Sequence, residues 1–440
     1  MPSPRRATTF ASILRSPALA VIAAYLLRMA LMWLTHRHED PIHPRFQTVG
    51  LEASLVARSL AMGKGFFGPF PGYQATTAAL APVYPFLGAI GYKLFRGDSY
   101  ATLFFQTMNC AFSAATCWPI CAIGKKLFGE KIGLASAWFW VFLPYAVYLP
   151  LEWAWDQSLS ALLLALIVLA TFSLREETSS SPSSSSSSLR WSGYGLLWAL
   201  AALTNPTLCI LLPFLLGWLV LRRRQIGLAS LKLVATSVFM FVLALAPWTI
   251  RNYYAVGGFV FVKSNFGLEF WLGNNPAVKE VYSPALHPAF DVRERIALIL
   301  NGEPNYNRAK MHSAIAYIEA HPGRFLQLSA ERFEDNWTAN YDTTIDPWLL
   351  ALHIRNANIW FCTLFSIASI VGMILALRAH FWNSLPLALC ILVLPIPYYI
   401  THTSLRYRHP IDPFLSIFTV YLFARLWSAL RPRTTPKLAA

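Results

Sequence analysis

Residues 229–276 read ASLKLVATSVFMFVLALAPWTIRNYYAVGGFVFVKSNFGLEFWLGNNP, and this stretch decides the fold. Its first part, residues 229–249, is an apolar run with one charged residue, Lys232. The run is long enough to cross the hydrocarbon core of a bilayer as a helix, which takes about 20 residues. It ends at a proline and a tryptophan, and Arg251 follows. Aromatic and basic residues at the end of an apolar run are typical of a membrane span that reaches the lipid headgroups.

The composition of the whole chain agrees with a membrane protein. The 440 residues are 56% hydrophobic and 13% charged, with 16 Trp, 18 Tyr and 30 Phe. A soluble protein would lack the polar surface needed to coat such a core. The formal net charge is +15, but the Lys and Arg residues fall in short clusters at the ends of apolar runs. We therefore expect no nucleic-acid partner and assign the basic residues to membrane topology. The six cysteines all lie in apolar stretches and are interpreted as packing residues.

Apolar runs of spanning length recur along the chain, and together they predict about ten spans in an all-α membrane protein. One run is too long for a single helix, and Asn205-Pro206 interrupts it because a proline breaks the helical hydrogen-bond ladder. We expect two short helices there. The runs lie at about 17–35, 101–124, 132–150, 157–174, 192–221, 229–249, 357–378, 382–401 and 411–429.

The basic clusters between spans all fall on one side if the N-terminus lies inside. The rule that cytoplasmic loops carry the positive charge then predicts both termini in the cytoplasm of a bacterial inner membrane. It also requires that Pro82–Phe95 lies at the outer surface and does not cross. The first apolar run is expected to be an uncleaved span. The predicted organisation is a transmembrane domain, 1–429, with outer loops 36–100 and 251–356, a Ser-rich cytoplasmic linker 175–191 and a cytoplasmic tail 430–440.

Carboxylates gather at the predicted outer surface, where acidic residues are costly unless they are paired, hydrated or used. Glu52 has the clearest local context, because apolar residues repeat at helical spacing from Leu51 and two glycines, Gly63 and Gly65, end the pattern. This predicts a short amphipathic helix on the membrane, with Glu52 near its start. Two roles remain open for Glu52: a carboxylate that stabilises the helix start, or a general base. The other outer carboxylates are Glu39, Asp40, Glu152, Asp156 and Glu269.

Basic residues are fewer on the predicted outer side, and four of them carry the prediction of a phosphate site. Arg251 ends a span, Lys263 follows it, and Arg406 and Arg408 lie in the loop before the last span. Arginine and lysine bind phosphate by charge-assisted hydrogen bonds. The alternative is that these long side chains reach lipid headgroups. Arg406 and Arg408 lie together on the predicted outer side, where the positive-inside rule predicts few basic residues. This favours phosphate binding as the role of both.

Several motifs resemble a known family. The run from Ala246 to Tyr253, continuing from Ser264 to Pro276, is similar to bacterial GT-C glycosyltransferases, relatives of the protein mannosyltransferases that use dolichyl-phosphate-mannose and of the lipid A aminoarabinose transferase. Shorter matches follow the family's order from about residue 50 to residue 413. They are Pro82-Val83-Tyr84-Pro85, Lys126-Leu127-Phe128-Gly129, Ala201-Ala202-Leu203-Thr204-Asn205-Pro206-Thr207 and Arg406-Tyr407-Arg408-His409-Pro410-Ile411-Asp412-Pro413.

The resemblance implies a GT-C fold with juxtamembrane helices in the first outer loop, a polyprenyl-phosphate sugar as donor and an acidic residue of that loop as base. Glu52 matches the base, and Asp40, Glu152 and Asp156 are further candidates for the catalytic group. The family's acidic pair at the loop start is absent here, and Glu39-Asp40 is its displaced equivalent. The lysine expected before the proline pair is replaced by Ala81, so the donor phosphate falls to Arg406, Arg408 and Arg251. Candidates for substrate binding are Tyr84, Asn205, Glu269 and Asn274.

The predicted activity is transfer of a sugar, hexosyl or pentosyl, from a polyprenyl phosphate to a lipid, glycan or protein acceptor outside the cytoplasm. One carboxylate and one or two cations are sufficient for this chemistry. No cofactor is required, although Glu52 with Glu152 or Asp156 leaves a divalent metal open. The alternative function is a transporter or flippase of lipid-linked glycans. Transporters place ionisable groups at mid-membrane, often within repeated halves, whereas here the acidic groups are predicted at the surface.

Overall fold

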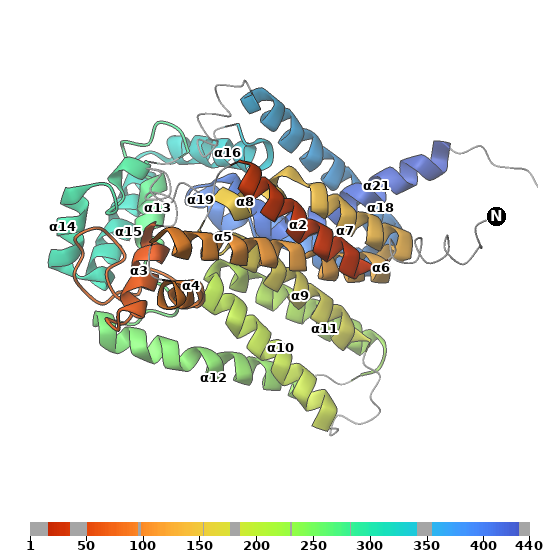
Figure 1. The fold of residues 1–440 in the computed structure, drawn as a ribbon, viewed down its shortest axis with the longest axis horizontal. Helices are drawn as coiled ribbons and strands as arrows, with labels where there is room; N and C mark the ends of the chain where they lie inside the picture. The colour runs from red at the N-terminus through yellow and green to blue at the C-terminus, as the bar shows by residue number, and fades with distance from the viewer. Residues whose placement is uncertain are drawn as a thin grey trace, which may run out of the picture.

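The computed structural model describes residues 16–35, 51–95, 98–152, 154–176, 185–228, 231–281, 283–340 and 354–430. Within these ranges the chain is helical, and the β pairing is limited to one isolated bridge between Phe67 and Thr76. The predicted all-α class is confirmed. Long helices run roughly along one direction, and a group of shorter helices lies at one end of them (Figure 1).

The long bundle and the end group account for the described helices. The bundle contains α2 (Pro17–Leu34), α5 (Asp98–Ala115), α6 (Cys117–Phe128), α7 (Glu130–Phe142), α8 (Pro144–Glu152), α9 (Gln157–Arg175), α10 (Ser185–Thr204), η1 (Pro206–Leu211), α11 (Leu212–Gln225), α12 (Leu231–Val256), α18 (Ile354–Val393) and α21 (Asp412–Leu430). The end group contains α3 (Leu51–Ala61), α4 (Val83–Leu94), α13 (Phe266–Gly273), η2 (Pro284–Leu286), α14 (Val292–Asn301), α15 (Glu303–Ala320), α16 (Pro322–Thr338), α19 (Ile396–Ile400), α20 (Leu405–Arg408) and η3 (His409–Ile411).

Six of the described helical segments are long and apolar enough to cross a membrane, or seven if α7 and α8 count as one bent span. The protein is therefore a multi-pass membrane protein, although the predicted number of about ten spans is not confirmed. One of the six, Asn356–Ile400, contains 45 residues, about twice the length that a bilayer needs. The backbone of His380 in its middle is not helical, at the place where the sequence predicts a break between two spans.

Two other breaks have clear causes in the sequence. The predicted break at Asn205-Pro206 is confirmed: α10 ends at Thr204, and the Asn205 side chain accepts the Thr207 N–H at 3.2 Å to begin η1. At Pro144 the chain bends by 45° between α7 and α8, because proline lacks the N–H that would continue the helix. Both breaks lie at the same end of the bundle, beside the short helices.

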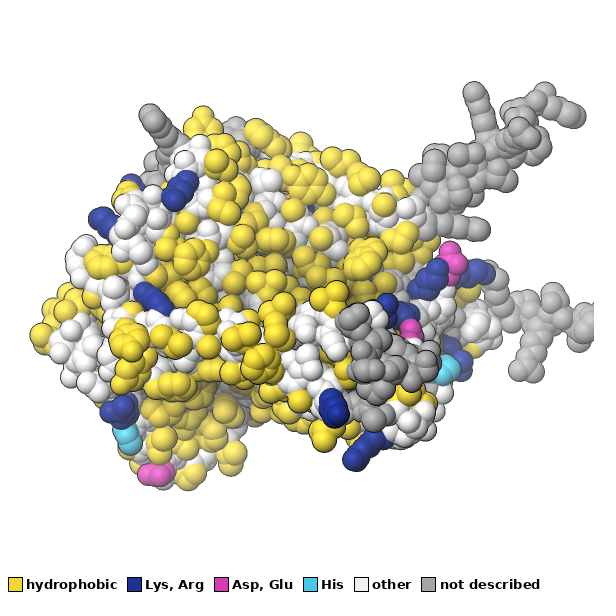
Figure 2. Space-filling view, turned by 90° about the horizontal axis from the view of Figure 1, so that it is seen from below, with side chains coloured by type: hydrophobic (Ala, Val, Ile, Leu, Met, Phe, Trp, Pro, Cys, Tyr) yellow, Lys and Arg dark blue, Asp and Glu magenta, His cyan; other side chains and the backbone are white. Residues whose placement is uncertain are grey.

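Small residues let the long helices pack closely. A Cβ atom on Gly133 would collide with the backbone of α6, one on Gly195 with Ser237 of α12, and one on Gly372 with Phe418 of α21. Such close approach is typical of helix packing in membranes. Large apolar side chains on the outside of the bundle remain exposed, for example Phe239 at 63% and Leu243 at 52% on α12. Figure 2 shows an extended apolar surface with most charged side chains toward the two ends of that face.

The basic clusters meet at one end of the bundle, here called the basic end. Lys126 pairs with Glu176 at 2.5 Å, Arg175 donates to Asn383 at 2.7 Å, and Arg223 donates to the Leu174 carbonyl at 2.7 Å. These contacts bring together the C-terminal ends of α6, α9 and α11 and the part of α18 around Asn383. The N-terminal end of α2 and the C-terminal end of α21 also point toward the basic end (Figure 1). The basic clusters that the sequence places on one side of the membrane thus lie at one end of the bundle. The assignment of this end to the cytoplasm stays a prediction.

The predicted outer loops form the opposite end. The amphipathic helix predicted from Leu51 is α3, and Gly63 and Gly65 follow it with φ of 77° and 79°, conformations that favour glycine. The Pro82–Phe95 segment is α4, which packs on α3. α10 begins at Ser185, within the predicted Ser-rich linker 175–191, and its Trp191 is buried. Glu39 and Asp40 lie outside the described residues, as do 177–184 of the linker and 431–440 of the tail.

Candidate active site

A cavity of about 760 Å³ opens at the end of the bundle opposite the basic end. Helix α9 shows the separation, because Asp156 before its first residue lines the cavity and Arg175 lies at the basic end. Nineteen helical residues extend about 28 Å, close to the thickness of a bilayer core. The polar residues that line the cavity come from both outer loops and from the ends of several long helices. They include Glu52, Tyr84, Glu152, Asp156, Asn205, Lys263, Glu269, His287, His402, Arg406 and Tyr407.

Glu52 lies on the first turn of α3 and lines the cavity. Its Oε2 atom is buried and has no hydrogen-bond partner among the described residues. Burial raises the pKa of Glu52 to about 7, and the negative charge of Glu269 adds to the effect, whereas Arg406 and Lys263 oppose it. A carboxyl group with this pKa is half ionised near neutral pH and is suited to accept a proton. A backbone hydrogen bond at Glu52 lowers this pKa in part, as expected at a helix start, so the two roles of Glu52 are compatible.

Glu152 and Asp156 reach the cavity from the connection between α8 and α9. Helix α8 ends at Glu152, and Asp156 immediately precedes α9. The Asp156 carboxylate accepts the Ser160 hydroxyl at 2.7 Å. Burial raises the pKa of Asp156, while Lys263 and Arg406 lower it. The same two cations therefore act on both Asp156 and Glu52, and they lie within electrostatic reach of the two carboxylates.

Arg406 is held by aromatic rings at the cavity wall. Its guanidinium lies over the rings of Trp155 and Tyr407, at 5.6 and 4.8 Å from their centroids, and its Nη2 donates to the Tyr407 hydroxyl at 2.9 Å. The Tyr407 ring stacks on Tyr398 with an angle of 4° between the planes. These contacts fix the position of the cation. Arg406 is thus placed where the sequence predicted a phosphate ligand.

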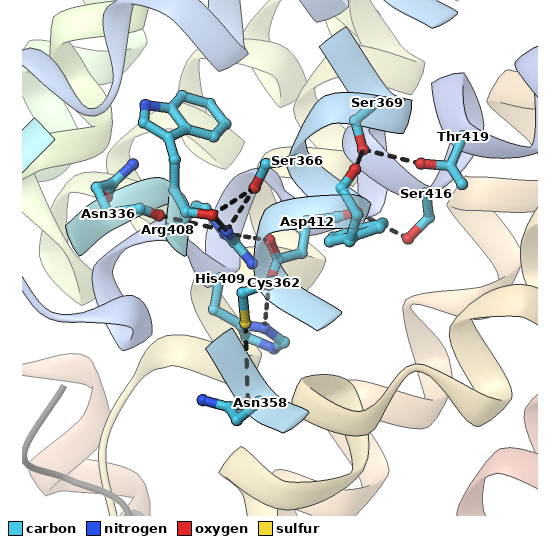
Figure 3. Close-up of polar contacts among 12 residues, drawn as sticks. Asn336, Asn358, Cys362, Ser366, Ser369, Arg408, His409, Asp412, Ser416 and Thr419 are labelled. Carbon is cyan, nitrogen blue, oxygen red and sulfur yellow. Dashed lines mark hydrogen bonds and ion pairs between the residues drawn. The ribbon is translucent and has the colours of Figure 1, made fainter. Parts of the chain in front are cut away.

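The structure does not bring Arg408 to the cavity. Its side chain is 1% exposed and forms an ion pair with Asp412 at 3.0 Å (Figure 3). It also donates to the Asn336 carbonyl and to the Ser366 hydroxyl, so that it joins α16, α18 and α21. These partners occupy the guanidinium in the interior of the bundle. Arg408 is therefore a buried structural cation and not a free phosphate ligand.

Arg251 and Asn274 also lie outside the cavity lining. Arg251 donates to the carbonyls of Thr77 and Phe66, at 2.5 and 3.1 Å, and so fastens the first outer loop to the end of α12. Asn274 is fully buried, and its amide donates to the carbonyls of Phe270 and Ile400. Both side chains use their polar groups to bind the backbone of neighbouring segments.

The other predicted substrate contacts line the cavity. Tyr84 pairs with Asn109 through its hydroxyl, and Asn205 begins η1. Glu269 accepts the Asn265 amide at 2.6 Å and lies 3.7 Å from His402. Of the eleven predicted site residues, seven line the cavity, three are held elsewhere, and Asp40 is outside the described residues.

Two histidines outside the predicted site, His287 and His402, line the cavity, and so does Lys263, which was among the outer basic residues but not in the final donor-phosphate set. Lys263 follows Phe261 and Val262, which also line it. His402 Nε2 is 3.0 Å from the Tyr407 hydroxyl. Burial, together with the charges of Arg406 and Arg332, lowers the pKa of His402 to about 3, so the ring is neutral. The Tyr407 hydroxyl lies between the Arg406 guanidinium, from which it accepts, and His402 Nε2. A lysine or histidine in a loop has no periodic signal, and only the three-dimensional arrangement locates it.

The carboxylates do not form a metal cluster among the described residues. Within these ranges no three His, Cys, Asp or Glu side chains are grouped so that they could hold a metal ion. A divalent ion at Glu52 with Glu152 or Asp156 stays a prediction.

Comparison with known proteins supports the family resemblance. Residues 79–250, less than half of the chain, match the family described as dolichyl-phosphate-mannose-protein mannosyltransferase. The oligosaccharyltransferase of Archaeoglobus fulgidus, solved with Zn and sulfate, aligns over 93% of this chain with a TM-score of 0.55 and 12% identity. At this identity the alignment shows a similar fold. The chain spans about half the length of the archaeal enzyme, 49% in that alignment.

Two further solved structures align with this chain. The archaeal oligosaccharyltransferase AglB from Archaeoglobus fulgidus, in complex with an inhibitory peptide and a dolichol-phosphate, aligns over 95% of this chain and 52% of its own, with a TM-score of 0.52 and 13% identity. ArnT from Cupriavidus metallidurans bound to undecaprenyl phosphate aligns over 96% and 79%, at 11% identity, but its TM-score of 0.37 is too low to establish a common fold. The sequence has no significant match among curated proteins.

Proposed function

We propose that this protein transfers a sugar from a polyprenyl-phosphate carrier to a lipid, glycan or protein acceptor at the outer face of the membrane. The observation that carries the proposal is the cavity opposite the basic end, in which the Glu52 carboxylate, with an Oε2 atom that lacks a hydrogen-bond partner among the described residues, lines the same space as Arg406 and Lys263. The family match and the likeness to an archaeal enzyme solved with a dolichol-phosphate support a lipid-phosphate donor. In this proposal the basic end and both termini lie in the cytoplasm of a bacterial inner membrane.

The chemistry needs a base and a site for the leaving phosphate. The acceptor oxygen or nitrogen attacks the anomeric carbon, the bond from that carbon to the phosphate oxygen breaks, and the electron pair of this bond goes to the lipid phosphate. The acceptor proton goes to Glu52, whose pKa of about 7 suits it to the task. The cavity positions the two reactants together, which supplies a large part of the rate enhancement.

Arg406 and Lys263 are assigned to the donor phosphate. They are the two Lys or Arg side chains among the residues that line the cavity, and both affect the pKa of Glu52 and of Asp156. A phosphate beside them would be paired by charge-assisted hydrogen bonds and held close to the base. The rings of Trp155 and Tyr407 hold the Arg406 guanidinium in place before the donor binds, which limits the entropy lost on binding. This assignment replaces Arg408 and Arg251 with Lys263.

The test measures binding of undecaprenyl phosphate to the purified full-length protein and release of sugar from a panel of undecaprenyl-phosphate sugars. A hydrogen bond to a charged group contributes about 1.5–3 kcal/mol, so R406A and K263A should each weaken binding by tenfold or more. The control is R293A, because the Arg293 side chain is 92% exposed on α14. E52Q should retain binding and lose transfer.

The outcomes separate the parts of the proposal. Equal binding by R406A, K263A and R293A would contradict the phosphate site. Normal transfer by E52Q would move the base to another carboxylate, Glu152, Asp156 or Asp40. Absence of transfer by the unaltered protein would contradict the glycosyltransferase, and movement of an unchanged lipid-linked glycan across the membrane would favour the transporter instead.

A further inference from the structure

Arg28 is a charged residue in the middle of the first membrane span. It lies on α2, one of the helices apolar enough to cross a membrane, and its exposed fraction is 0%. A charge at this depth is costly unless it meets polar groups inside the protein. Nothing in the proposed chemistry uses Arg28, because it does not line the cavity.

The partners of Arg28 are oxygen atoms of the neighbouring helices. Its Nε donates to the Ala146 carbonyl at 2.9 Å and to the Ser113 hydroxyl at 3.0 Å. Its Nη2 donates to the Trp140 carbonyl at 3.3 Å, and its Nη1 donates to the carbonyls of Ala24 and Val141, at 2.9 and 3.5 Å. The Ser113 hydroxyl also donates to the Ala146 carbonyl, at 2.8 Å. Three of these oxygens belong to the bent pair α7 and α8, more than 110 positions away in sequence.

Two prolines explain why those carbonyls need a partner. In a helix the carbonyl of residue i accepts the N–H of residue i+4, so Trp140 would pair with residue 144 and Ala146 with residue 150. Both of these residues are proline and have no N–H. Trp140 keeps only a long 3.4 Å bond from Leu143 N. Arg28 donates to both of the carbonyls that the prolines leave without their helical partner.

The position of the charge also suits the end of α7. The carbonyls of Trp140 and Val141 lie in its last turn, where the helix dipole places a partial negative charge that a cation stabilises. A buried arginine with several donors can serve this end and the first turn of α8 together, whereas a lysine offers a single nitrogen.

We propose that Arg28 is a positioning residue, which holds the 45° bend between α7 and α8 by donating to the carbonyls that Pro144 and Pro150 leave without a helical N–H partner. The bend directs α8 toward the cavity, so that Glu152, Trp155 and Asp156 line it. Because Trp155 lies against Arg406, the effect of Arg28 extends to the phosphate site; this last step rests on the proposed function.

A thermal-unfolding cycle tests the clamp without any substrate. R28M should lower the Tm of the detergent-solubilised protein, since it leaves the Trp140 carbonyl with only the long bond from Leu143 N and the Ala146 carbonyl with only the Ser113 hydroxyl. P150A returns an N–H at position 150, which can pair with the Ala146 carbonyl. The loss of Tm caused by R28M should therefore be smaller, by about half, in the P150A background. Equal losses in the two backgrounds would overturn the proposal.

A second measurement tests the positioning of the site. R28M should weaken binding of undecaprenyl phosphate at least tenfold, and R28M/P150A should recover part of it. The control L26M changes a side chain that is 59% exposed on the same helix and should bind normally. If R28M does not accumulate, R28Q, whose amide can serve one carbonyl, replaces it in both cycles.

Normal binding by R28M or R28Q would overturn the positioning role. If the unaltered protein itself fails to bind undecaprenyl phosphate, the proposed function fails, while the Tm coupling between positions 28 and 150 still decides whether Arg28 holds the bend.

Discussion

Glu52 and His287 face each other across the two outer loops, with 4.0 Å between Glu52 Oε1 and His287 Nδ1. The His287 Nδ1 atom already accepts the Ala289 N–H at 3.1 Å, so in the neutral ring the proton is on Nε2. Burial lowers the pKa of His287, which keeps the ring neutral near pH 7. His287 therefore closes one side of the space around Glu52 without donating to its carboxylate or neutralising its charge.

The pH dependence of transfer should follow Glu52. Its pKa of about 7 lies above the usual range for a carboxyl group. The base is needed in its ionised form, so transfer should be fully present above pH 8 and fall tenfold for each pH unit below about 6. Initial rates between pH 5 and 9 measure this. An acid limb near pH 4.5 would show that the acting base is an unperturbed carboxylate.

Removing the charge of Glu269 should move that acid limb. Glu269 raises the pKa of Glu52 because two negative charges in one cavity repel each other. In E269Q the pKa of Glu52 should fall, so transfer should extend to lower pH. The control is E319Q, which changes an exposed carboxylate on α15. A limb that stays in place in E269Q would mean that burial alone sets the pKa of Glu52.

The Tyr407 hydroxyl should matter through Arg406. It accepts from Arg406 Nη2 at 2.9 Å and lies 3.0 Å from His402. Y407F keeps the ring that stacks on Tyr398 and under Arg406 but removes the oxygen that orients the guanidinium. We expect a three- to tenfold weaker binding of undecaprenyl phosphate with little change in Tm. A large loss of Tm at normal binding would contradict this role.

The sequence predicted the parts of this site that depend on periodicity and on helix ends. The apolar spacing after Leu51 predicted α3, and the Asn205-Pro206 pair predicted the break that brings Asn205 to the cavity. The charge pattern predicted that Glu52, Glu152 and Asp156 lie at one end, and all three line the cavity. Each of these inferences rests on local hydrogen bonding or on the cost of charge in a membrane.

Side-chain direction could not be predicted in the same way. Arg406 and Arg408 lie in one helical turn, and residues two apart on a helix point about 200° apart. One of them therefore faces the cavity and the other the interior, and nothing in the sequence decides which. Arg251 was equally ambiguous, because the carbonyls that it binds belong to Phe66 and Thr77 of the first outer loop.

Cysteine-accessibility labelling tests the topology. Ser185 begins α10 at the basic end, and Asn305 lies on α15 of the end group. Cysteines at these two positions should be labelled from opposite sides of the membrane. The native cysteines give a low background, since five of the six are buried. Labelling from the same side would contradict the arrangement in which the cavity and the basic end face different compartments.

Arg408 should behave as a structural residue, unlike Arg406. Arg408 and Asp412 form a buried pair, each side chain 1% exposed, and loss of one partner from such a pair costs about 3–5 kcal/mol because the other charge stays buried. R408A should therefore lower Tm and the amount of folded protein strongly. R406A should leave Tm nearly unchanged and weaken binding of undecaprenyl phosphate.

The double variant R408M/D412L tests whether the charge of Arg408 is needed for folding or for binding of undecaprenyl phosphate. An apolar pair of similar volume replaces a buried ion pair at little cost, so it should recover most of the Tm lost in R408A. The recovery should be incomplete, since His409 Nδ1 also lies 3.2 Å from the Asp412 carboxylate and loses that partner. Because no positive charge remains at position 408, a double variant that binds undecaprenyl phosphate normally would show that the phosphate does not need it. A stable R408A or R408M/D412L protein without binding would instead return Arg408 to the donor site, since only a direct charge contact would then account for the loss.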